Sequence, residues 1–408
     1  MSLEFHFDIV CPYAYLASTQ VEELARRHQK TLRWKPVLLG GLYKSLQAPQ
    51  QPATTWPAAK AEHNARDLFR QAEILGVPLV FPEGHPRRSV EAMRLLVLAE
   101  DGARASLARR LYAAYWVEGR DISDRDVLAE IGTEFGLAIE DIDTPSIKEE
   151  LHQRTAAALA RGHFGVPTLQ WDDRFWWGVD RLALLESALG AKPEPPASSG
   201  SDGSQLCFFH DFSSPFSYLA STQIERIASK HGAALEWTPI LLGALFREIG
   251  TPDVPLFAMN PSKQAWMGQD MLAWAQWWGV PLQFPSHFPL RTVTALRLAL
   301  LEPSITPAIY AAAWAEDRNI GEPQVLAEIL QDEGLDAPAL LEKTSDPATK
   351  ARLRANPERA GQAGVCGVPT FLVNDSLLFW GQDRLAMVER ALDGWIPRVD
   401  AQRGPIRS

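Results

Sequence analysis

The sequence has 408 residues, 46% of them hydrophobic and 22% charged, and its formal net charge is −10 at pH 7. This length exceeds that of one ordinary hydrophobic core, so we expect two domains of about 200 residues each. The acidic balance argues against a nucleic-acid partner, because phosphate binding needs a basic face. The sequence contains no run of about 18 apolar residues, so we expect no membrane span.

Cysteine use and the start of the chain bear on the cellular compartment. Three cysteines in no paired spacing do not build a disulfide framework. The first residues lead directly into an apolar strand pattern, without the basic-then-apolar pattern of a signal peptide. We therefore expect a cytoplasmic protein.

The opening stretch of the chain occurs a second time, 203 positions later (210 − 7). Residues 7–20 read FDIVCPYAYLASTQ and residues 210–223 read HDFSSPFSYLASTQ. In each copy an apolar run predicts a strand, Leu3–Phe7 or Leu206–Phe209. The proline that follows suits the first turn of a helix, because its missing N–H would be unpaired there. Cys11 and Ser214 thus precede a helix, where free N–H groups and the helix dipole favour an anion. We expect the chemistry at these two positions.

The later elements also occur in pairs. A second apolar run, Leu32–Leu39 or Leu235–Leu242, predicts a strand that ends at glycine. Helical periodicity then dominates the middle of each half. The predicted helices are Ala58–Leu75, Ser89–Glu100, Ala105–Val117, Asp124–Phe135 and Ser146–Arg161 in the first half, and Ser262–Trp278, Thr292–Leu301, Pro307–Glu316, Glu322–Glu333 and Pro347–Ala363 in the second. Two short strands and a closing helix follow: Thr168–Trp171, Arg174–Trp177 and Asp180–Leu189, then Thr370–Val373, Leu377–Trp380 and Asp383–Leu392.

A polar segment separates the two copies. Residues 191–205 (AKPEPPASSGSDGSQ) contain three prolines, four serines and two glycines, which predicts a flexible linker. We therefore divide the chain into domains at residues 1–190 and 206–396. The element order predicts an α/β class: a thioredoxin-like fold with an inserted helical subdomain, present twice.

A Val-Pro-Thr motif precedes the third strand of each half, at residues 166–168 and 368–370. On its own the motif is compatible with an ordinary trans proline at a strand start. In the thioredoxin superfamily, however, this position resembles the cis-proline loop, which faces the residue before the first helix and pairs with extended peptides. Because the Cys11 and Ser214 motifs lie upstream in that order, we expect cis prolines in both halves.

Two further motifs can hold charged groups. Residues 177–180 (WGVD) and 380–383 (WGQD) precede the closing helices and read first as plain helix caps. Such a helix start can also bind a ligand carboxylate, with the aspartate facing an ammonium group. Residues 260–263 (NPSK) place a lysine in the first turn of a helix. The first half keeps Lys60 but has Pro57 in place of the asparagine.

Four of these motifs together resemble the 2-hydroxychromene-2-carboxylate isomerase family, in the DsbA-like group with the kappa-class glutathione transferases. They are residues 211–219 (DFSSPFSYL), 260–263 (NPSK), 367–370 (GVPT) and 380–384 (WGQDR). The resemblance spans nearly the whole of each half, so the chain resembles two fused copies. It implies that the halves form an intramolecular pseudo-dimer, in place of the homodimer of single-copy relatives.

The resemblance also implies glutathione-dependent cis–trans isomerisation of a small aromatic-degradation intermediate. Ser214 would hold the glutathione thiolate, which adds to the unsaturated substrate, lets a bond rotate and leaves unchanged. The other candidates for glutathione or substrate binding are Asn260, Lys263, Val368, Pro369, Gln382 and Asp383 in the second half, and Lys60, Val166, Pro167 and Asp180 in the first. The implied site of the second half therefore groups Ser214 with Asn260 and Lys263.

The first half departs from this pattern, because Cys11 stands in place of the serine and Val179 in place of Gln382. Cys11 is either a reactive thiolate in its own right or part of a copy retained for packing. Because a helix start lowers the pKa of a cysteine, we expect Cys11 to titrate below an ordinary thiol and to react faster than Cys207 and Cys366.

Three other functions stay open. A thiol–disulfide oxidoreductase is disfavoured because neither residues 11–14 (CPYA) nor 214–217 (SPFS) contain a resolving cysteine, although monothiol chemistry at Cys11 is not disfavoured. A kappa-class-like glutathione transferase could use Cys11 or Ser214. A non-enzymatic binder of peptides or glutathione conjugates would use the two Val-Pro-Thr edges.

Overall fold

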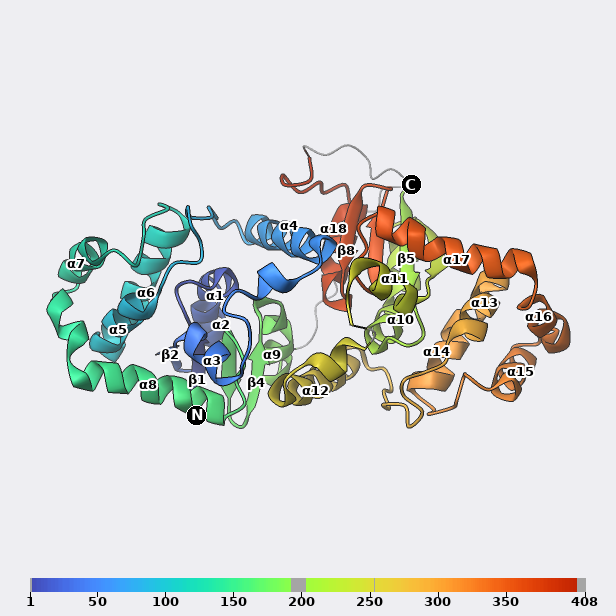
Figure 1. Cartoon of the computed structure of the whole chain (residues 1–408), viewed down its shortest axis with the longest axis horizontal. Coiled ribbons are helices and arrows are strands. Elements are labelled where there is room, and N and C mark those ends of the chain that lie inside the picture. Colours follow the sequence, from blue (N-terminus) through green and yellow to red (C-terminus); the bar gives the residue numbers. More distant parts are fainter. Residues whose placement is uncertain (1, 192–202, 253, 402–408) are drawn as a thin grey trace. The chain divides into compact units, whose positions relative to one another are not determined.

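The computed structural model describes residues 2–191, 203–252 and 254–401 (Figure 1). Most of the expected linker, residues 192–202, lies outside these ranges. The chain divides into two compact units. Unit 1 comprises Met1–Thr55, Leu68–Pro193 and Asn260–Trp266, and unit 2 comprises Trp56–Asp67, Glu194–Met259 and Met267–Ser408. Each unit thus contains one short segment from the other half of the sequence.

Each unit is built on a four-stranded mixed sheet. The strand order in unit 1 is β2 (Leu32–Pro36), β1 (Leu3–Phe7), β3 (Thr168–Trp171) and β4 (Arg174–Trp177), and in unit 2 it is β6 (Ala234–Pro239), β5 (Gln205–His210), β7 (Thr370–Val373) and β8 (Leu377–Trp380). The first strand of each unit, β1 or β5, runs parallel to one neighbour and antiparallel to the other, and the last two strands form an antiparallel hairpin. This topology confirms the predicted thioredoxin-like α/β fold.

Helices fill the rest of each half. The first half contains α1 (Pro12–Ser18), α2 (Val21–Arg27), α3 (Leu39–Ser45), α4 (Ala58–Ile74), α5 (Val90–Leu98), α6 (Asp101–Trp116), α7 (Arg125–Glu134), α8 (Pro145–Ala160) and α9 (Leu182–Ala188). The second contains α10 (Pro215–Lys230), α11 (Leu242–Ile249), α12 (Pro261–Trp278), α13 (Val293–Leu301), α14 (Thr306–Trp314), α15 (Pro323–Asp332), α16 (Ala337–Lys343), α17 (Pro347–Gln362) and α18 (Leu385–Leu392). A short 3-10 turn precedes each closing helix. The helix after Pro215 is continuous, whereas the one after Pro12 is divided into α1 and α2.

The second strand of each unit is shorter than predicted, because a helix begins where the apolar run was expected to continue as strand. A buried aspartate after the first strand caps that helix. The carboxylate of Asp8 accepts a hydrogen bond from the backbone N–H of Leu39 at 2.8 Å, and that of Asp211 accepts one from Leu242 at 2.9 Å. An apolar run alone does not reveal a helix whose start depends on such a distant carboxylate.

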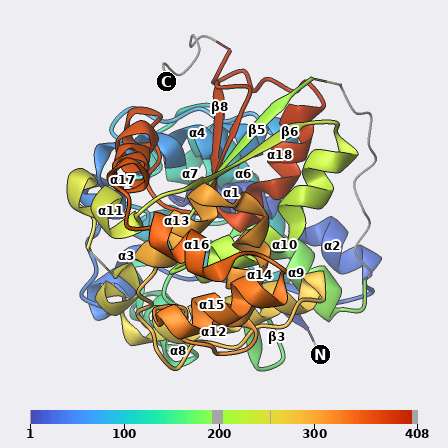
Figure 2. The ribbon, with the colours of Figure 1, turned by 90° about the vertical axis from the view of Figure 1, so that its right-hand side faces the viewer.

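The sheet of unit 2 has a layer of helices on each side. Figure 2 shows α11 and α17 on one side, and α10 and α18 on the other. A buried apolar cluster joins the sheet to α11 and α17: Cys207, Phe209, Ile240, Leu245, Ala360, Ala363, Val365, Val368, Leu372 and Leu378. Such burial stabilises the fold by about 25 cal/mol per Å² of apolar surface. Because Val368 belongs to this cluster, the loop before β7 is anchored in the core.

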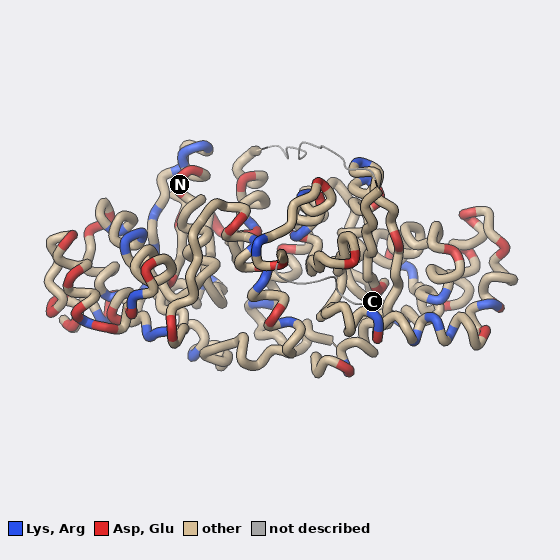
Figure 3. Tube along the Cα trace, turned by 90° about the horizontal axis from the view of Figure 1, so that it is seen from above, with Lys and Arg blue, Asp and Glu red and all other residues tan. Residues whose placement is uncertain are grey.

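Lys and Arg residues alternate with Asp and Glu residues along the helices of each unit (Figure 3). Within the described ranges, no helix combines the length and the apolar content that a bilayer crossing requires. The same residues contain no group of three His, Cys, Asp or Glu side chains placed to hold a metal ion. The expected association of the two halves as a pseudo-dimer stays a prediction.

Candidate active site

Ser214 lies between β5 and α10, at the N-cap position of the helix that Pro215 begins. Its side-chain oxygen accepts a hydrogen bond from the backbone N–H of Ser217 at 3.2 Å, which satisfies one of the free donors of the first turn. Its hydroxyl donates to the carbonyl oxygen of Val368 at 3.3 Å. The start of α10 therefore faces the Val368-Pro369 loop directly.

Cys11 has the corresponding place in unit 1, and its thiol donates to the carbonyl oxygen of Val166 at 3.2 Å. The Cys11 side chain makes no capping hydrogen bond, unlike that of Ser214. The Val166–Pro167 and Val368–Pro369 peptide bonds are both cis, as the order of the motifs predicts. Sequence reasoning missed two further cis prolines, at His85–Pro86 and Phe288–Pro289.

The expected activation of Cys11 is wrong. Burial raises the pKa of the Cys11 thiol to about 12, and the carboxyl group of Asp8 adds to the increase, which outweighs the lowering by backbone N–H groups of the helix start. Only 6% of the Cys11 surface is exposed. Burial likewise raises the pKa values of Cys207 and Cys366 to about 12, and all three cysteines are free. The Cys11 site therefore holds a protonated thiol at neutral pH.

Cys11 is therefore expected to react slowly with alkylating reagents. A thiol whose pKa is about 12 carries roughly three thousandfold less thiolate at neutral pH than an ordinary thiol with a pKa of about 8.5. Alkylation of each cysteine in the folded protein, followed against pH by mass spectrometry, measures this difference. Modification of Cys11 at the rate of free glutathione at neutral pH would show that the thiol is ionised despite its burial.

A tryptophan at the end of each hairpin packs against the glycine of the cis-proline loop. A Cβ atom added to Gly367 would lie 2.9 Å from Nε1 of Trp380, and one added to Gly165 would lie 2.8 Å from Nε1 of Trp177. Contacts this short exclude any larger residue unless the indole moves. Trp380 therefore fixes the loop that presents the Val368 carbonyl to Ser214.

The aspartates of the two WGxD motifs already have cationic partners. Asp383 lies 3.2 Å from a guanidinium nitrogen of Arg384, and Asp180 lies 2.9 Å from one of Arg181. Gln382 precedes Asp383 and is 4% exposed. The backbone N–H groups at this helix start are the part of the motif that would suit a ligand carboxylate.

The structure divides the group formed by Ser214, Asn260 and Lys263. Asn260 and Lys263 belong to unit 1, the unit of Cys11. The side-chain oxygen of Asn260 accepts the backbone N–H of Lys263 at 2.9 Å, which is an ordinary helix cap. The ammonium of Lys263 lies 5.2 Å from the ring centre of Trp177. Lys60, from the first half of the sequence, belongs instead to unit 2.

Sequence reasoning also missed the buried aspartate beside each site. The backbone N–H of Ser214 donates to the carbonyl oxygen of Asp211 at 3.0 Å, so the two residues form one tight turn. The Asp211 carboxylate accepts the N–H groups of Ser213 and Leu242, both at 2.9 Å. The signal was present in the sequence, because Asp8 and Asp211 are identical at the repeat offset.

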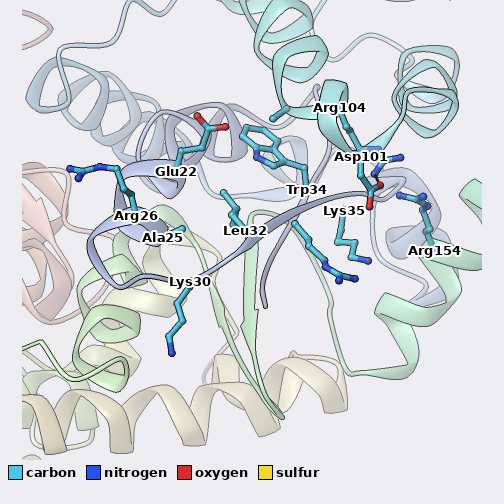
Figure 4. Close-up of a pocket in the computed structure, with 12 residues that line it drawn as sticks. Glu22, Ala25, Arg26, Lys30, Leu32, Trp34, Lys35, Asp101, Arg104 and Arg154 are labelled. Carbon is cyan, nitrogen blue, oxygen red and sulfur yellow. Dashed lines mark hydrogen bonds and ion pairs between the residues drawn. The ribbon is translucent and has the colours of Figure 1, made fainter. Parts of the chain in front are cut away.

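A separate pocket of unit 1 is formed by α2, β2, α6 and α8 (Figure 4). Its charged lining residues are the basic Arg26, Lys30, Arg33, Lys35, Arg104 and Arg154 and the acidic Glu22 and Asp101. Several of these basic groups are neutralised within the unit: Arg104 pairs with Asp101, Arg154 with Glu150 and Lys35 with Glu4. No candidate site residue lines this pocket, so we assign it no part in the chemistry.

Comparison with known proteins identifies the family. The DSBA-like thioredoxin domain matches twice, over residues 2–190 and 205–393. The 2-hydroxychromene-2-carboxylate isomerase of Pseudomonas putida is 31% identical over 194 residues, which cover 47% of this chain and 95% of that protein. The isomerase of Sphingobium xenophagum is 33% identical over 189 residues, covering 45% of this chain and 96% of the relative. Human glutathione S-transferase kappa 1 is 27% identical over 222 residues, covering 48% and 95%.

A solved structure of 2-hydroxychromene-2-carboxylate isomerase, with selenomethionine, aligns with a TM-score of 0.41 and 27% identity, covering 47% of this chain and 95% of that one. Each of these single-copy relatives corresponds to about half of the present chain. The chain therefore belongs to the DSBA-like thioredoxin domain family, in the group of the 2-hydroxychromene-2-carboxylate isomerases, and it carries the domain twice.

Proposed function

We propose that unit 2 catalyses glutathione-dependent cis–trans isomerisation of a small unsaturated aromatic acid, with Ser214 as the residue that holds the thiolate. Ser214 carries this proposal. It combines a hydroxyl donor, the N-terminus of a 16-residue helix and a cis-proline loop at one point. Relatives that are named as 2-hydroxychromene-2-carboxylate isomerases and as glutathione transferases support both the reaction and the cofactor.

The Ser214 hydroxyl is free to change its acceptor. Its distance of 3.3 Å to the Val368 carbonyl is long for an O–H···O hydrogen bond, which is normally about 2.7–2.8 Å. An anion at the helix start would form a shorter, charge-assisted bond with the same proton. The N–H of Ser217 holds the oxygen in place during this exchange.

The surrounding residues fit glutathione. The backbone of Val368, anchored in the core, offers an edge for the extended tripeptide, and the helix start at Gln382 suits its carboxylate end. When bound, glutathione would supply a thiolate that adds reversibly to a conjugated double bond and so allows the bond to rotate. The protein's task is to keep that sulfur ionised and positioned.

The required stabilisation is within reach of these groups. Lowering the pKa of a thiol by about two units from about 8.5 takes about 2.7 kcal/mol of preferential thiolate stabilisation. A charge-assisted hydrogen bond supplies about 1.5–3 kcal/mol and a helix N-terminus about 0.3–1 kcal/mol or more. Burial raises the pKa of Asp211, whose carboxyl group is directed at the N–H groups of Ser213 and Leu242.

A glutathione transferase is the second candidate, because the same arrangement would activate glutathione towards an electrophile and the human kappa relative carries that name. A two-cysteine redox cycle is disfavoured, since Cys11 is buried, protonated and without a resolving cysteine in its motif.

The test is turnover of a cis–trans isomerisable aromatic pyruvate by the full chain with glutathione, without it, and with S-methylglutathione. We expect isomerisation only with the free thiol, and unchanged glutathione at the end. Consumption of glutathione into a thioether would indicate the transferase. Equal isomerisation rates with and without glutathione would contradict the proposal.

A further inference from the structure

The segment 56–67 lies against the end of the β7–β8 hairpin within unit 2. The ammonium of Lys60 lies 5.8 Å from the ring centre of Trp380 and 4.9 Å from that of Trp56. The His63 ring contacts Trp380 edge-on at 5.8 Å between centroids. Residues from the first half of the sequence thus contact the tryptophan that packs against the cis-proline loop facing Ser214.

Trp380 contacts both Lys60 and the cis-proline loop that precedes β7. Its indole packs against Gly367, and the next residue, Val368, accepts the Ser214 hydroxyl. Cys366, which precedes Gly367, is close enough to Lys60 for its sulfur to interact with the ammonium electrostatically. Lys60 therefore stands beside the loop on which an extended ligand would lie.

Lys60 carries its charge in a partly desolvated place. It is half-buried, and among the residues that the structure describes no carboxylate forms an ion pair with it. Burial lowers the pKa of Lys60. The nearby Cys366 thiol does not balance the ammonium charge, because burial raises the pKa of that thiol to about 12 and keeps it protonated at neutral pH. A partly desolvated ammonium held on indole faces gains most from an incoming anion.

Lys263 has the equivalent position in unit 1. It lies over Trp177, the counterpart of Trp380, and Trp266 of the same segment packs against Trp177 at 5.3 Å. The two lysines are thus exchanged between the copies: the first half supplies the lysine of the Ser214 unit, and the second half supplies the lysine of the Cys11 unit. The exchange matters for the chemistry because the residue before the first helix is a cysteine in unit 1 and a serine in unit 2.

We propose that Lys60, and not Lys263, completes the Ser214 site by binding a carboxylate of glutathione. This inference rests on the proposed function of that site. It makes the active site of the second half dependent on a residue of the first half.

The test compares Lys60→Met with Lys263→Met in the full chain, both in a Cys11→Ala background, and follows glutathione-dependent isomerisation because that readout reports the Ser214 site. Removing the cation that binds a carboxylate is expected to raise KM for glutathione about ten- to a hundredfold. The value of kcat should change much less, because the lysine binds a remote end of the ligand. Lys60→Arg should recover most of the affinity. Lys263→Met should stay within about twofold of the background.

Glutathione esterified at its glycine carboxylate adds a second arm to the test. If Lys60 binds that carboxylate, the ester loses affinity for the background protein but not for Lys60→Met; if it binds the γ-glutamyl carboxylate, the Lys60 effect persists with the ester. A large effect of Lys263→Met with none of Lys60→Met would overturn the inference and leave glutathione dependence intact. Isomerisation that needs no glutathione in any variant would instead overturn the proposed function.

Discussion

Replacing Ser214 by alanine is expected to lower glutathione-dependent turnover by about ten- to a hundredfold. The variant removes one charge-assisted hydrogen bond to the thiolate, worth about 1.5–3 kcal/mol. Affinity for glutathione should stay mostly intact, because the ends of the tripeptide are bound elsewhere. Turnover at saturating glutathione and Kd by calorimetry separate the two effects.

Two comparisons make the Ser214 result specific. The oxygen also caps α10 through the Ser217 N–H, so the variant should lose about 1 kcal/mol of stability, which thermal unfolding measures. Cys11→Ala should cost much less turnover, because its buried thiol is protonated. Full activity in Ser214→Ala, or loss only in Cys11→Ala, would move the chemistry to unit 1.

Asp67→Ala is expected to lower the free energy of unfolding of unit 2 by about 3 kcal/mol. The carboxylate of Asp67 accepts two hydrogen bonds from the Arg384 guanidinium, at 2.7 and 2.9 Å, and the side chains are only 5% and 11% exposed. Without Asp67 the guanidinium stays buried and loses these two hydrogen bonds, while Asp383 still lies 3.2 Å from it. Denaturant unfolding of the full chain measures the loss.

Two further variants control for the position and for the charge. Glu62→Ala, on the same helix, removes a carboxylate that is 44% exposed and lies 3.6 Å from Arg66, so it should cost less than about 1 kcal/mol. The double variant Asp67→Leu with Arg384→Met removes both buried charges and should recover much of the stability. A loss no larger in Asp67→Ala than in Glu62→Ala would mean that segment 56–67 does not support unit 2.

Most of the fold follows from patterns within each copy. Hairpin strands such as Thr168–Trp171 and Leu377–Trp380 end where predicted, because short β-rich runs between turns have clear limits. The second strands end earlier than the apolar runs predict, because the starts of α3 and α11 are capped by Asp8 and Asp211, which follow β1 and β5 and are distant in sequence. A local pattern holds no information about such a contact.

The candidate site was predictable only in part. The pairing of Ser214 with Val368 follows from motif order in a thioredoxin-like fold, and the structure has the contact. The exchange of Lys60 and Lys263 was not predictable, because the two lysines occupy the same position in the repeat. The sequence does not show in which unit each of them lies. The raised pKa of Cys11 was not predictable from sequence either, because a helix start is visible there whereas the burial of the thiol beside Asp8 is not.

The most direct measurement is the pKa of the glutathione thiol bound to the full chain, from the ultraviolet absorbance of the thiolate against pH, in wild type and in Ser214→Ala. The proposed site predicts a pKa near 6.5 in the wild type, about two units below a free thiol, and a value raised by about one to two units in the variant. The same depressed pKa in both proteins, or an unshifted thiol in the wild type, would contradict the role assigned to Ser214.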